Sequence, residues 1–339
     1  MTISELPNDV LLEIFSFYQD DQRDTGSEYE DTSAWHALVH MCRRWRCLVF
    51  ASPRRLGLQL FFTDSSSSKE ALGVWPELPI AIHVSNFGPW HPPLQALVNN
   101  TIAALEQHNR VRKIRLRGDP IPMLKTFSAM KKPFPSLVKL VLKSDVIQGQ
   151  IQGSMIPDSF LGGSAPRLQS LEFDSIPCPE IGKLLLSTPN LVFLRLGLIP
   201  HSGQGYTSPE AMVNGLSMLK RLKSLCLTFH WETSRPQSQQ ESEHPPHFAP
   251  VVLPTLTDIN FFGDKEYLED IVSRIDTPLL ANIAISFIDR PVSVTSPLRD
   301  FIGRTETFGA YSKIDTYPQA YVYPSDGRTK IEFFRPDGV

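Results

Sequence analysis

The residues that could perform chemistry are few and lie far apart along the chain. His36 and His40 are separated by four positions, which places two imidazoles on one face of a helix, as some metal sites require. No carboxylate or thiol at a matching spacing completes a tetrahedral ligand set, so we interpret both histidines as polar residues at the edge of a helix. The sequence therefore predicts no metal site and no bound cofactor.

Two further patterns resemble catalytic or phosphate-binding motifs only in their letters. Ser66 and Lys69 have the spacing of a Ser-x-x-Lys nucleophile pair, but the serine belongs to a serine run at 65–68. Gly203 and Gly205 form a glycine pair without the rest of a phosphate-binding loop. The chain also lacks a G-x-S-x-G elbow, an H-E-x-x-H motif and clustered cysteines. We expect no catalytic residue and no enzymatic activity.

The composition is that of an ordinary globular protein and favours neither nucleic acid nor a membrane as a partner. The 339 residues are 41% hydrophobic and 20% charged, and the formal net charge is -3. This balance gives no bulk electrostatic attraction to nucleic acid or to anionic lipid. No apolar run reaches the roughly 20 residues that span a bilayer, and the first residues do not resemble a signal peptide. These features predict a cytoplasmic or nuclear location.

The cysteines support the same compartment. Cys42, Cys47, Cys178 and Cys226 form no C-x-x-C pair. Because such unpaired cysteines most often lie reduced among apolar neighbours, we expect all four to be core thiols of a protein in a reducing compartment.

Basic residues gather in one part of the chain, between Met41 and Thr63, where no acidic residue occurs. A nucleic-acid-binding segment could look like this locally, but the arginines interleave with apolar positions and the whole chain is slightly acidic. We interpret them as an exposed helix face that meets an acidic partner or a loop of the same chain. These arginines are Arg43, Arg44, Arg46, Arg54 and Arg55, around Trp45.

The first helix expected in the chain has more apolar surface than a short domain can bury. Pro7 suits the first turn of a helix. Two neighbouring apolar stripes follow at the i, i+4, i+7 spacing of one helix face. A domain of about 50 residues hides little of its surface, so we expect it to bury one stripe and to present the other to a partner. The stripes are Val10, Ile14 and Phe17, and Leu11, Phe15 and Tyr18.

A second apolar helical segment follows and ends near Pro53. Its apolar residues form two neighbouring rows at helical spacing, and the second row is shorter than the first. The rows are Trp35, Leu38, Val39, Cys42 and Val49, and Met41, Trp45 and Leu48.

Residues 1–56 resemble an F-box, in the version found in the basidiomycete-type F-box-like family. The resemblance rests on Leu6-Pro7-x-x-Val10-Leu11-x-x-Ile14-Phe15 and on the closing Cys42-Arg43-Arg44-Trp45-Arg46. It implies a helical module that binds the Skp-type adaptor of a cullin-RING ubiquitin ligase. The residues implied in adaptor binding are Leu6, Pro7, Val10, Leu11, Ile14, Phe15, Trp35, Leu38, Val39, Cys42 and Trp45.

An acidic insertion at 19–33 departs from the short turn that joins the first two helices of an F-box. It contains six acidic residues and one base, Arg23. Such composition predicts a solvated loop, and because loop-closure entropy grows slowly with length, the helices can still pack. An insertion near the docking surface could also obstruct the adaptor.

A repeated L-x-x-L-x-L pattern follows, with starts 23 to 34 residues apart and often a proline two residues earlier. It resembles a degenerate leucine-rich repeat. Each final L-x-L alternation predicts a short strand with one buried face, and the segments 179–187, 208–222 and 265–275 have helical periodicity. The seven segments are 111–116, 137–142, 168–173, 191–196, 222–227, 256–261 and 280–285.

Residues 57–339 are therefore expected to form an α/β solenoid with a curved parallel sheet and helices outside it. The asparagine that follows each strand in the repeat family is absent, although Asp119 and Asp145 could act as caps, so we expect an irregular, open curve. A first strand at 76–84 and a helix at 92–109 precede the repeats. A flexible loop at 232–250 interrupts them, and a hairpin at 319–335 ends the sheet, with strands at 320–323 and 330–334.

The open face of this sheet is the expected site of client binding. Residues between the buried leucines point to that side, and they run from basic at the first repeats, through Phe193 beside Arg195, to neutral or acidic at the last. The residues assigned to client binding are Lys113, Arg115, Lys139, Glu172, Phe193, Arg195, Asp258 and Asn260.

The two resemblances together imply a substrate-recognition subunit of an SCF-type ubiquitin ligase. In this role the chain itself is not catalytic and holds a client near a separately recruited ubiquitin-conjugating enzyme. The alternative is a protein-interaction scaffold without ligase function, in which the F-box-like helices cap the solenoid and the acidic insertion blocks docking.

Overall fold

The computed structural model describes fifteen segments of the chain. Outside them lie most of the acidic insertion, the serine run 65–68, Gly203 and Gly205, most of the loop 232–250 and parts of the expected hairpin at 319–335. The described segments are 3–21, 35–53, 55–64, 72–73, 77–87, 94–145, 156–157, 159–178, 181–199, 206–229, 250–287, 297–298, 300–301, 323–325 and 328–333.

The N-terminal segments form a helical module. It consists of η1 (Ile3–Glu5), α1 (Asn8–Asp21), α2 (Trp35–Met41) and α3 (Arg43–Ala51). Pro7 precedes α1 as expected, and its carbonyl oxygen accepts a hydrogen bond from the Leu11 amide at 3.1 Å. The helical row expected from Trp35 to Val49 is interrupted at Cys42, which has extended backbone angles and caps α3.

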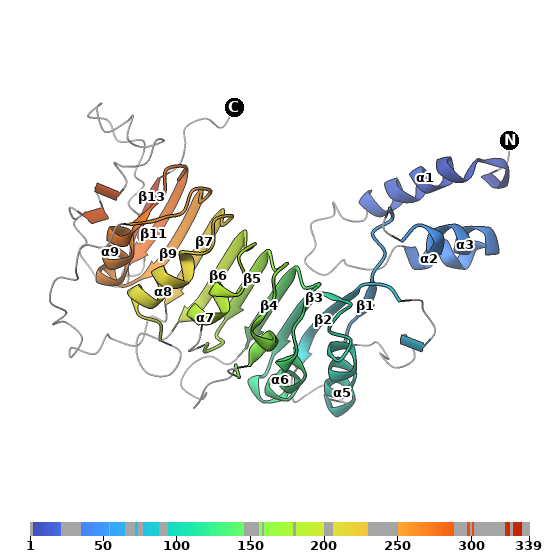
Figure 1. The fold of residues 1–339 in the computed structure, drawn as a ribbon, viewed down its shortest axis with the longest axis horizontal. Helices are drawn as coiled ribbons and strands as arrows, with labels where there is room; N and C mark the ends of the chain where they lie inside the picture. Colours follow the sequence, from blue (N-terminus) through green and yellow to red (C-terminus); the bar gives the residue numbers. More distant parts are fainter. Residues whose placement is uncertain are drawn as a thin grey trace.

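Most of the remaining strands join one open sheet. Among the described residues the sheet has 11 strands, of which the first 9 are parallel. Figure 1 shows these strands following one another along an arc, with the helical module beyond β1. In order across the sheet they are β1 (Leu60–Phe62), β2 (Ile80–Phe87), β3 (Val111–Gly118), β4 (Lys139–Ser144), β5 (Ser170–Asp174), β6 (Phe193–Ile199), β7 (Ser224–Phe229), β9 (Asp258–Gly263), β11 (Asn282–Phe287), β13 (Arg328–Phe333) and β12 (Tyr323–Ser325).

The seven L-x-x-L-x-L segments form the seven consecutive strands β3 to β7, β9 and β11, which confirms the strand prediction. The middle leucine or isoleucine of each motif lies opposite its counterpart on the next strand and is buried. The expected first strand is β2, whereas β1 was not predicted. The aligned residues are Ile114, Leu140, Leu171, Leu194, Leu225, Ile259 and Ile283.

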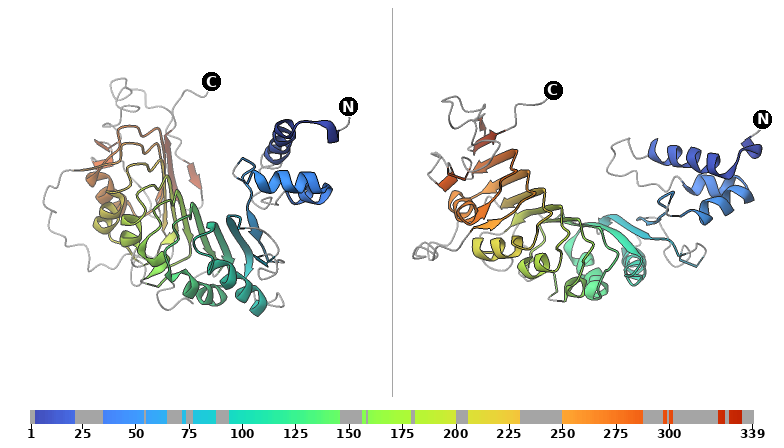
Figure 2. Two further views of the ribbon diagram at one scale, coloured as in Figure 1. Left: turned by 45° about the vertical axis from the view of Figure 1, so that its right-hand side comes forward. Right: turned by 45° about the horizontal axis from the view of Figure 1, so that its top comes forward.

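Helical elements follow β2, β3, β4, β5, β6 and β9, and the helices lie on the outer side of the arc (Figure 2). The helices expected near 92–109, 179–187, 208–222 and 265–275 are present, each within or at the limits of the expected range. A helix after β3 was not predicted, although Asp119-Pro120 is a start signal. The helical elements are α5 (Leu94–Leu105), α6 (Pro120–Phe127), η2 (Ser128–Lys131), η3 (Phe160–Gly163), α7 (Ile181–Leu186), α8 (Pro209–Leu216) and α9 (Lys265–Arg274).

The two aspartates that could replace the missing asparagine have different roles. The Asp119 carboxylate accepts a hydrogen bond from the Ile121 amide at 2.9 Å and so caps α6. The Asp145 carboxylate instead pairs with Arg117, with 2.9 Å between Oδ1 and Nε. Only the first of the two acts as a helix cap.

The far end of the sheet is formed by an antiparallel hairpin, as the sequence predicted. β13 pairs with β11, and β12 pairs with β13. The first hairpin strand begins at Tyr323, the last residue of the expected segment 320–323. A separate two-stranded parallel sheet, β8 (Val251–Val252) with β10 (Ile275–Asp276), was not predicted.

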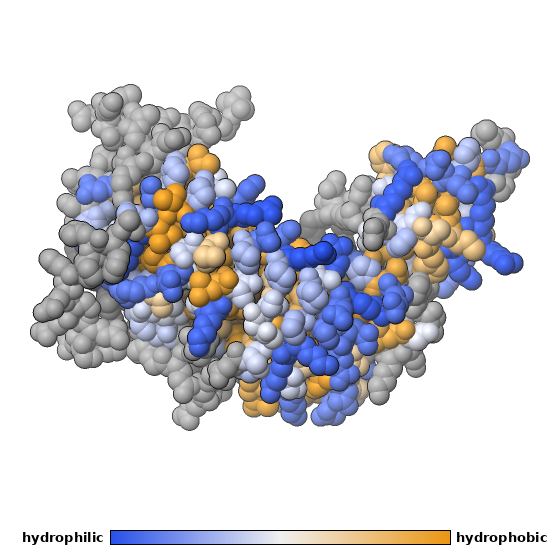
Figure 3. Space-filling view, viewed as in Figure 1, coloured by the Kyte–Doolittle hydropathy of each residue, from blue (hydrophilic) through white to orange (hydrophobic). Residues whose placement is uncertain are grey.

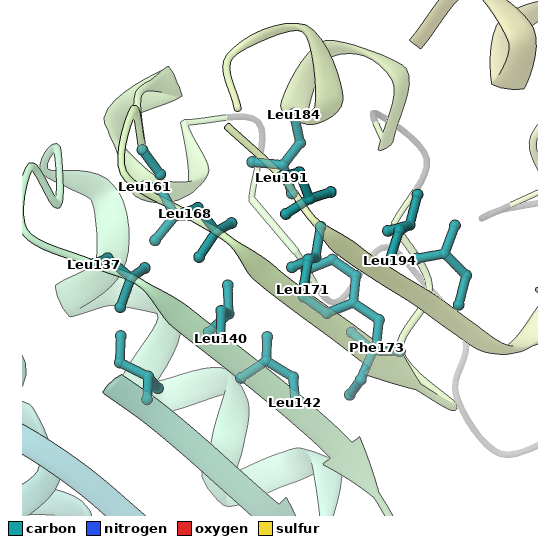
Figure 4. Close-up of a cluster of buried hydrophobic side chains, with 14 of the residues drawn as sticks. Leu137, Leu140, Leu142, Leu161, Leu168, Leu171, Phe173, Leu184, Leu191 and Leu194 are labelled. Atoms are coloured by element: carbon teal, nitrogen blue, oxygen red, sulfur yellow. The ribbon is translucent and has the colours of Figure 1, made fainter. Parts of the chain in front are cut away.

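The buried side chains form one continuous cluster that runs from Leu11 in α1 to Phe301. Figure 4 shows how Leu140, Leu171 and Leu194 from neighbouring strands lie side by side within it. Each repeat therefore buries its leucines against the adjacent repeats. Within the described part of the chain, no helix is long and apolar enough to span a membrane.

Candidate functional site

One of the two apolar stripes of α1 faces into the molecule. Leu11 and Phe15 are buried, together with Leu12, and the Phe15 ring packs on Trp45 with 4.7 Å between ring centroids. Tyr18, the third member of this stripe, lies in the last turn of α1 and is exposed. The buried stripe holds α1 against α2 and α3.

The other stripe faces solvent. Val10, Ile14 and Phe17 have exposed fractions of 43%, 40% and 67%. We call these three residues the α1 stripe. Met41 at the end of α2 is also exposed, and hydrophobic surface is visible on the helical module in Figure 3. Monomeric proteins rarely gather large apolar side chains at the surface without a binding role, so this stripe is the first candidate site.

The remaining residues implied in adaptor binding divide by burial. Trp35 is buried and donates a hydrogen bond from Nε1 to the Gln59 carbonyl oxygen at 3.0 Å, which links α2 to the chain before β1. A side chain that is buried in this way positions the exposed residues and does not itself reach a partner. Buried are Leu11, Phe15, Trp35, Leu38 and Val39; partly buried are Leu6 and Trp45; exposed are Pro7, Val10, Ile14 and Cys42.

Three arginines of the basic cluster hold the helical module together. Arg44 donates to the carbonyl oxygen of Leu6 and to Asn8, and Arg46 donates to the Val39 carbonyl oxygen at 2.9 Å. Arg55 pairs with Glu13 at 2.8 Å. These contacts favour the interpretation that the arginines meet groups of the same chain over the interpretation as a nucleic-acid-binding segment. Arg54 lies outside the described residues.

The cysteine prediction was only partly right. All four cysteines are free thiols, but Cys42 and Cys47 are exposed on the helical module instead of buried. Cys42 is at the surface because it caps α3, with its sulfur accepting a hydrogen bond from the Trp45 amide. Cys178 is buried, and Cys226 is half-buried on the open face of the sheet.

The open face of the sheet is the second candidate site. Successive residues of a strand point to opposite sides, so the neighbours of the buried leucines face away from the helices. Two rows of such residues cross the strands in register. The first row is Ala81, Lys113, Lys139, Ser170, Phe193, Ser224 and Asp258, and the second is His83, Arg115, Val141, Glu172, Arg195, Cys226 and Asn260.

These rows contain all the residues assigned to client binding. Lys139, Arg195 and Asn260 are exposed, and the other five are half-buried. Val141 does not follow the expectation for its row, because it is only 1% exposed. It lies between Arg115 and Glu172 on the neighbouring strands, whose longer side chains flank it.

Ion pairs organise the middle of the open face. The Glu172 carboxylate is 2.8 Å from Lys143 Nζ and 3.5 Å from Arg195 Nε. Burial raises the pKa of the nearby Cys226 thiol, although the charge of Arg195 opposes this effect. Cys226 is therefore a protonated, weakly nucleophilic thiol at neutral pH.

Toward the last strands the face becomes acidic and amide-rich. The Asp258 carboxylate accepts a hydrogen bond from the Asn282 side chain at 2.6 Å.

Near the first strands, the open face of the sheet has a depression. A depression of about 60 Å³ lies over β2, β3 and β4, lined by Ala81, His83, Lys113, Arg115 and Lys139. The sequence analysis did not assign His83 to this face. Its position between the apolar residues Ile82 and Val84 in the expected first strand could have indicated that it points to the open side.

The described residues contain no cluster of three or more histidine, cysteine or acidic side chains that could hold a metal ion. His40 is exposed, and the side chain of His36 lies outside the described residues. Both candidate sites are therefore suited to binding. The α1 stripe offers apolar contacts, and the open face of the sheet offers charges and hydrogen bonds. Comparison with protein-family models found no match for this chain, and comparison with curated proteins found no significant similarity.

Proposed function

We propose that the chain is the substrate-recognition subunit of an SCF-type ubiquitin ligase. The helical module binds a Skp-type adaptor, and the open face of the sheet binds a client protein. The chain contributes proximity, because it holds the client beside the ubiquitin-conjugating enzyme that the rest of the complex recruits. The F-box and leucine-rich-repeat resemblances of the sequence supply the assignment to this class of protein.

The observation that most supports the proposal is the exposure of the α1 stripe. A helix of a free-standing module needs only one apolar face for its own core, and Leu11 and Phe15 already provide it. Val10, Ile14 and Phe17 form a second face that the described part of the chain leaves in solvent. In the alternative, where the helices only cap the sheet, both stripes should be buried against residues 57–116.

The test is co-purification of the full chain with a Skp-type adaptor, followed by titration. We expect a stable complex with the unaltered chain. Ile14→Asp should weaken it by about 30-fold or more, which corresponds to about 2 kcal/mol, because a carboxylate would be desolvated within an apolar interface. The free protein should keep its fold, since Ile14 is 40% exposed.

Ile121→Asp is the matched control. Ile121 lies on α6 and is 67% exposed, so the substitution makes the same chemical change far from the helical module. We expect this variant to bind the adaptor like the unaltered chain. A folded, unaltered chain that fails to bind the adaptor would contradict the proposal, as would equal losses for the two variants.

A further inference from the structure

We propose that the open face over β2, β3 and β4 binds an acidic peptide segment of a partner protein. Within the proposed function this partner is the client, and the acidic segment is the feature by which it is recognised. We call the residues around the depression, His83, Lys113, Arg115 and Lys139, the basic hollow.

The basic hollow is set by the register of three neighbouring strands. Lys113 lies opposite Lys139, and His83 lies opposite Arg115, so the four side chains converge on one area. Ala81 lies opposite Lys113, and its small side chain leaves the depression of about 60 Å³ between them. The open-face positions of these two rows on β2, β3 and β4 contain no acidic residue. A carboxylate entering the hollow would be within reach of several cationic donors.

Two acidic side chains beyond the hollow, Glu172 and Asp145, form ion pairs with cations outside it. Glu172 contacts both Lys143 and Arg195, and Asp145 contacts Arg117. Along the first row, the first acidic residue is Asp258 on β9.

A peptide fits this charge distribution better than a nucleic acid does. The positive charge of Lys113, Arg115 and Lys139 lies on β3 and β4. It is followed by Glu172, then by Phe193, and finally by Asp258 in the same sheet. A nucleic acid presents a phosphate at every nucleotide and is attracted by a long basic track, whereas the whole chain here has a formal net charge of -3. A short acidic segment with uncharged neighbours can place its carboxylates over β3 and β4, on the basic side of Glu172.

The row geometry also suggests the spacing of the bound segment. Lys139 and Phe193 are two strands apart in one row, which is about 10 Å at the usual strand separation. An extended peptide covers this distance in about three residues. We therefore expect acidic residues followed or preceded, about three positions away, by an apolar residue that packs on Phe193.

The experiment is a selection of phage-displayed random dodecapeptides on the full chain, without any adaptor. Selected peptides are then synthesised with a fluorescein label and titrated by anisotropy. We expect enrichment of aspartate and glutamate, with an apolar residue at the spacing given above. Lys113→Glu/Lys139→Glu should weaken binding by about 10-fold or more, and raising the salt concentration should weaken binding to the unaltered chain.

Lys131→Glu/Lys132→Glu is the matched control, because it makes the same charge change at exposed residues that follow α6 on the helix side. It should leave peptide binding within about 2-fold of the unaltered chain. Selected peptides without excess acid, or equal effects of the two double variants, would overturn the proposal. Tighter binding of a labelled single-stranded oligonucleotide at the same residues would assign the face to nucleic acid and would also overturn it.

This result is separable from that of the adaptor titration. Ile14→Asp should retain peptide binding, and the Lys113→Glu/Lys139→Glu variant should retain adaptor binding, because the changed residues lie on different elements of the fold. Failure of adaptor binding alone would contradict the ligase assignment and leave the basic hollow as a peptide site. Failure of peptide binding alone would contradict only the recognition of an acidic segment.

Discussion

Adjacent residues of α1 have opposite environments, and the proposed adaptor-docking site depends on this contrast. Val10 is exposed while Leu11 is buried, and Ile14 is exposed while Phe15 is buried. Successive side chains on a helix are separated by about 100° of rotation, so two stripes one residue apart cannot both face the same neighbour fully. The sequence spacing predicts both stripes. Which of the two stripes faces solvent depends on how α2 and α3 pack against α1, and the spacing of residues in the sequence does not determine that packing.

Two phenylalanines two positions apart in α1 should respond very differently to truncation. Phe15 is 1% exposed and packs on Trp45, so Phe15→Ala should lower the free energy of unfolding of the helical module by about 3 kcal/mol or more. Phe17 is 67% exposed, and Phe17→Ala should change the free energy of unfolding of the module by less than about 0.5 kcal/mol. Limited proteolysis within residues 1–56, followed across a urea series, measures both. Similar protection of the two variants would mean that α1 is not packed through its Leu11 and Phe15 face.

Each strand of the sheet ends at a point where the chain must turn toward the outer helices, and Gly118 shows how tight that turn can be. Its φ of +137° is unfavourable for other residues, and a Cβ atom there would lie 2.6 Å from the Phe87 backbone nitrogen. The next residue, Asp119, donates its amide to the Phe87 carbonyl oxygen at 2.9 Å. The ends of β2 and β3 are therefore held in close approach by the absence of a side chain.

Gly118→Ala should lower the stability of the sheet by about 2 kcal/mol or more, because it adds both backbone strain and a clash with main-chain atoms. Gly73→Ala is the control, since nothing lies within 4 Å of the Cβ position there. We expect the control to be within about 0.5 kcal/mol of the unaltered chain in urea unfolding. Equal stabilities of the two variants would show that β2 and β3 separate at this end.

At the scale of elements, the sequence predicted the seven repeat strands, β2 and the hairpin, and it missed β1, β8, β10 and α6. Seven strands follow from the L-x-x-L-x-L segments, because each buries its leucines against identical neighbours. β1 is three residues long and follows no repeat motif, and β8 and β10 are two residues each, so their pairing depends on contacts that no local pattern encodes. The break at Cys42 was missed because the apolar spacing continues across it. The alternation of the strands predicted the two rows of the open face. The depression beside Ala81 depends on the register between strands, which the sequence does not reveal.

At the scale of the whole molecule, the continuous core is built from contacts between neighbouring repeats. Phe261 on β9 illustrates this: its ring contacts Phe229 on β7 and Phe287 on β11, with centroids 5.9 Å and 6.4 Å away. It also stacks on Tyr267 of α9. Stability in such an array is approximately a sum of unit and neighbour contributions, so damage is expected to remain local.

Phe261→Ala should therefore raise amide hydrogen exchange mainly in β7, α9, β9 and β11, because it removes a buried ring that joins these elements and costs about 3 kcal/mol or more. Protection in β2, β3 and β4 should change little. Hydrogen exchange measured by mass spectrometry on the full chain reports the protection of both groups of elements in one experiment. A uniform loss of protection along the sheet would indicate that the array unfolds as a single cooperative unit.

The open ends of the sheet have a consequence for how this kind of protein can diversify. Among the described residues, no strand pairs with the free edge of β1, so a strand and helix pair could be duplicated or deleted in the middle of the arc without breaking a ring. The varied distances between the L-x-x-L-x-L segments, from 23 to 34 residues, suggest that individual connections have already changed length independently. Unequal recombination in the genes of such proteins would lengthen or shorten the open face of the sheet while the N-terminal helical module is inherited unchanged.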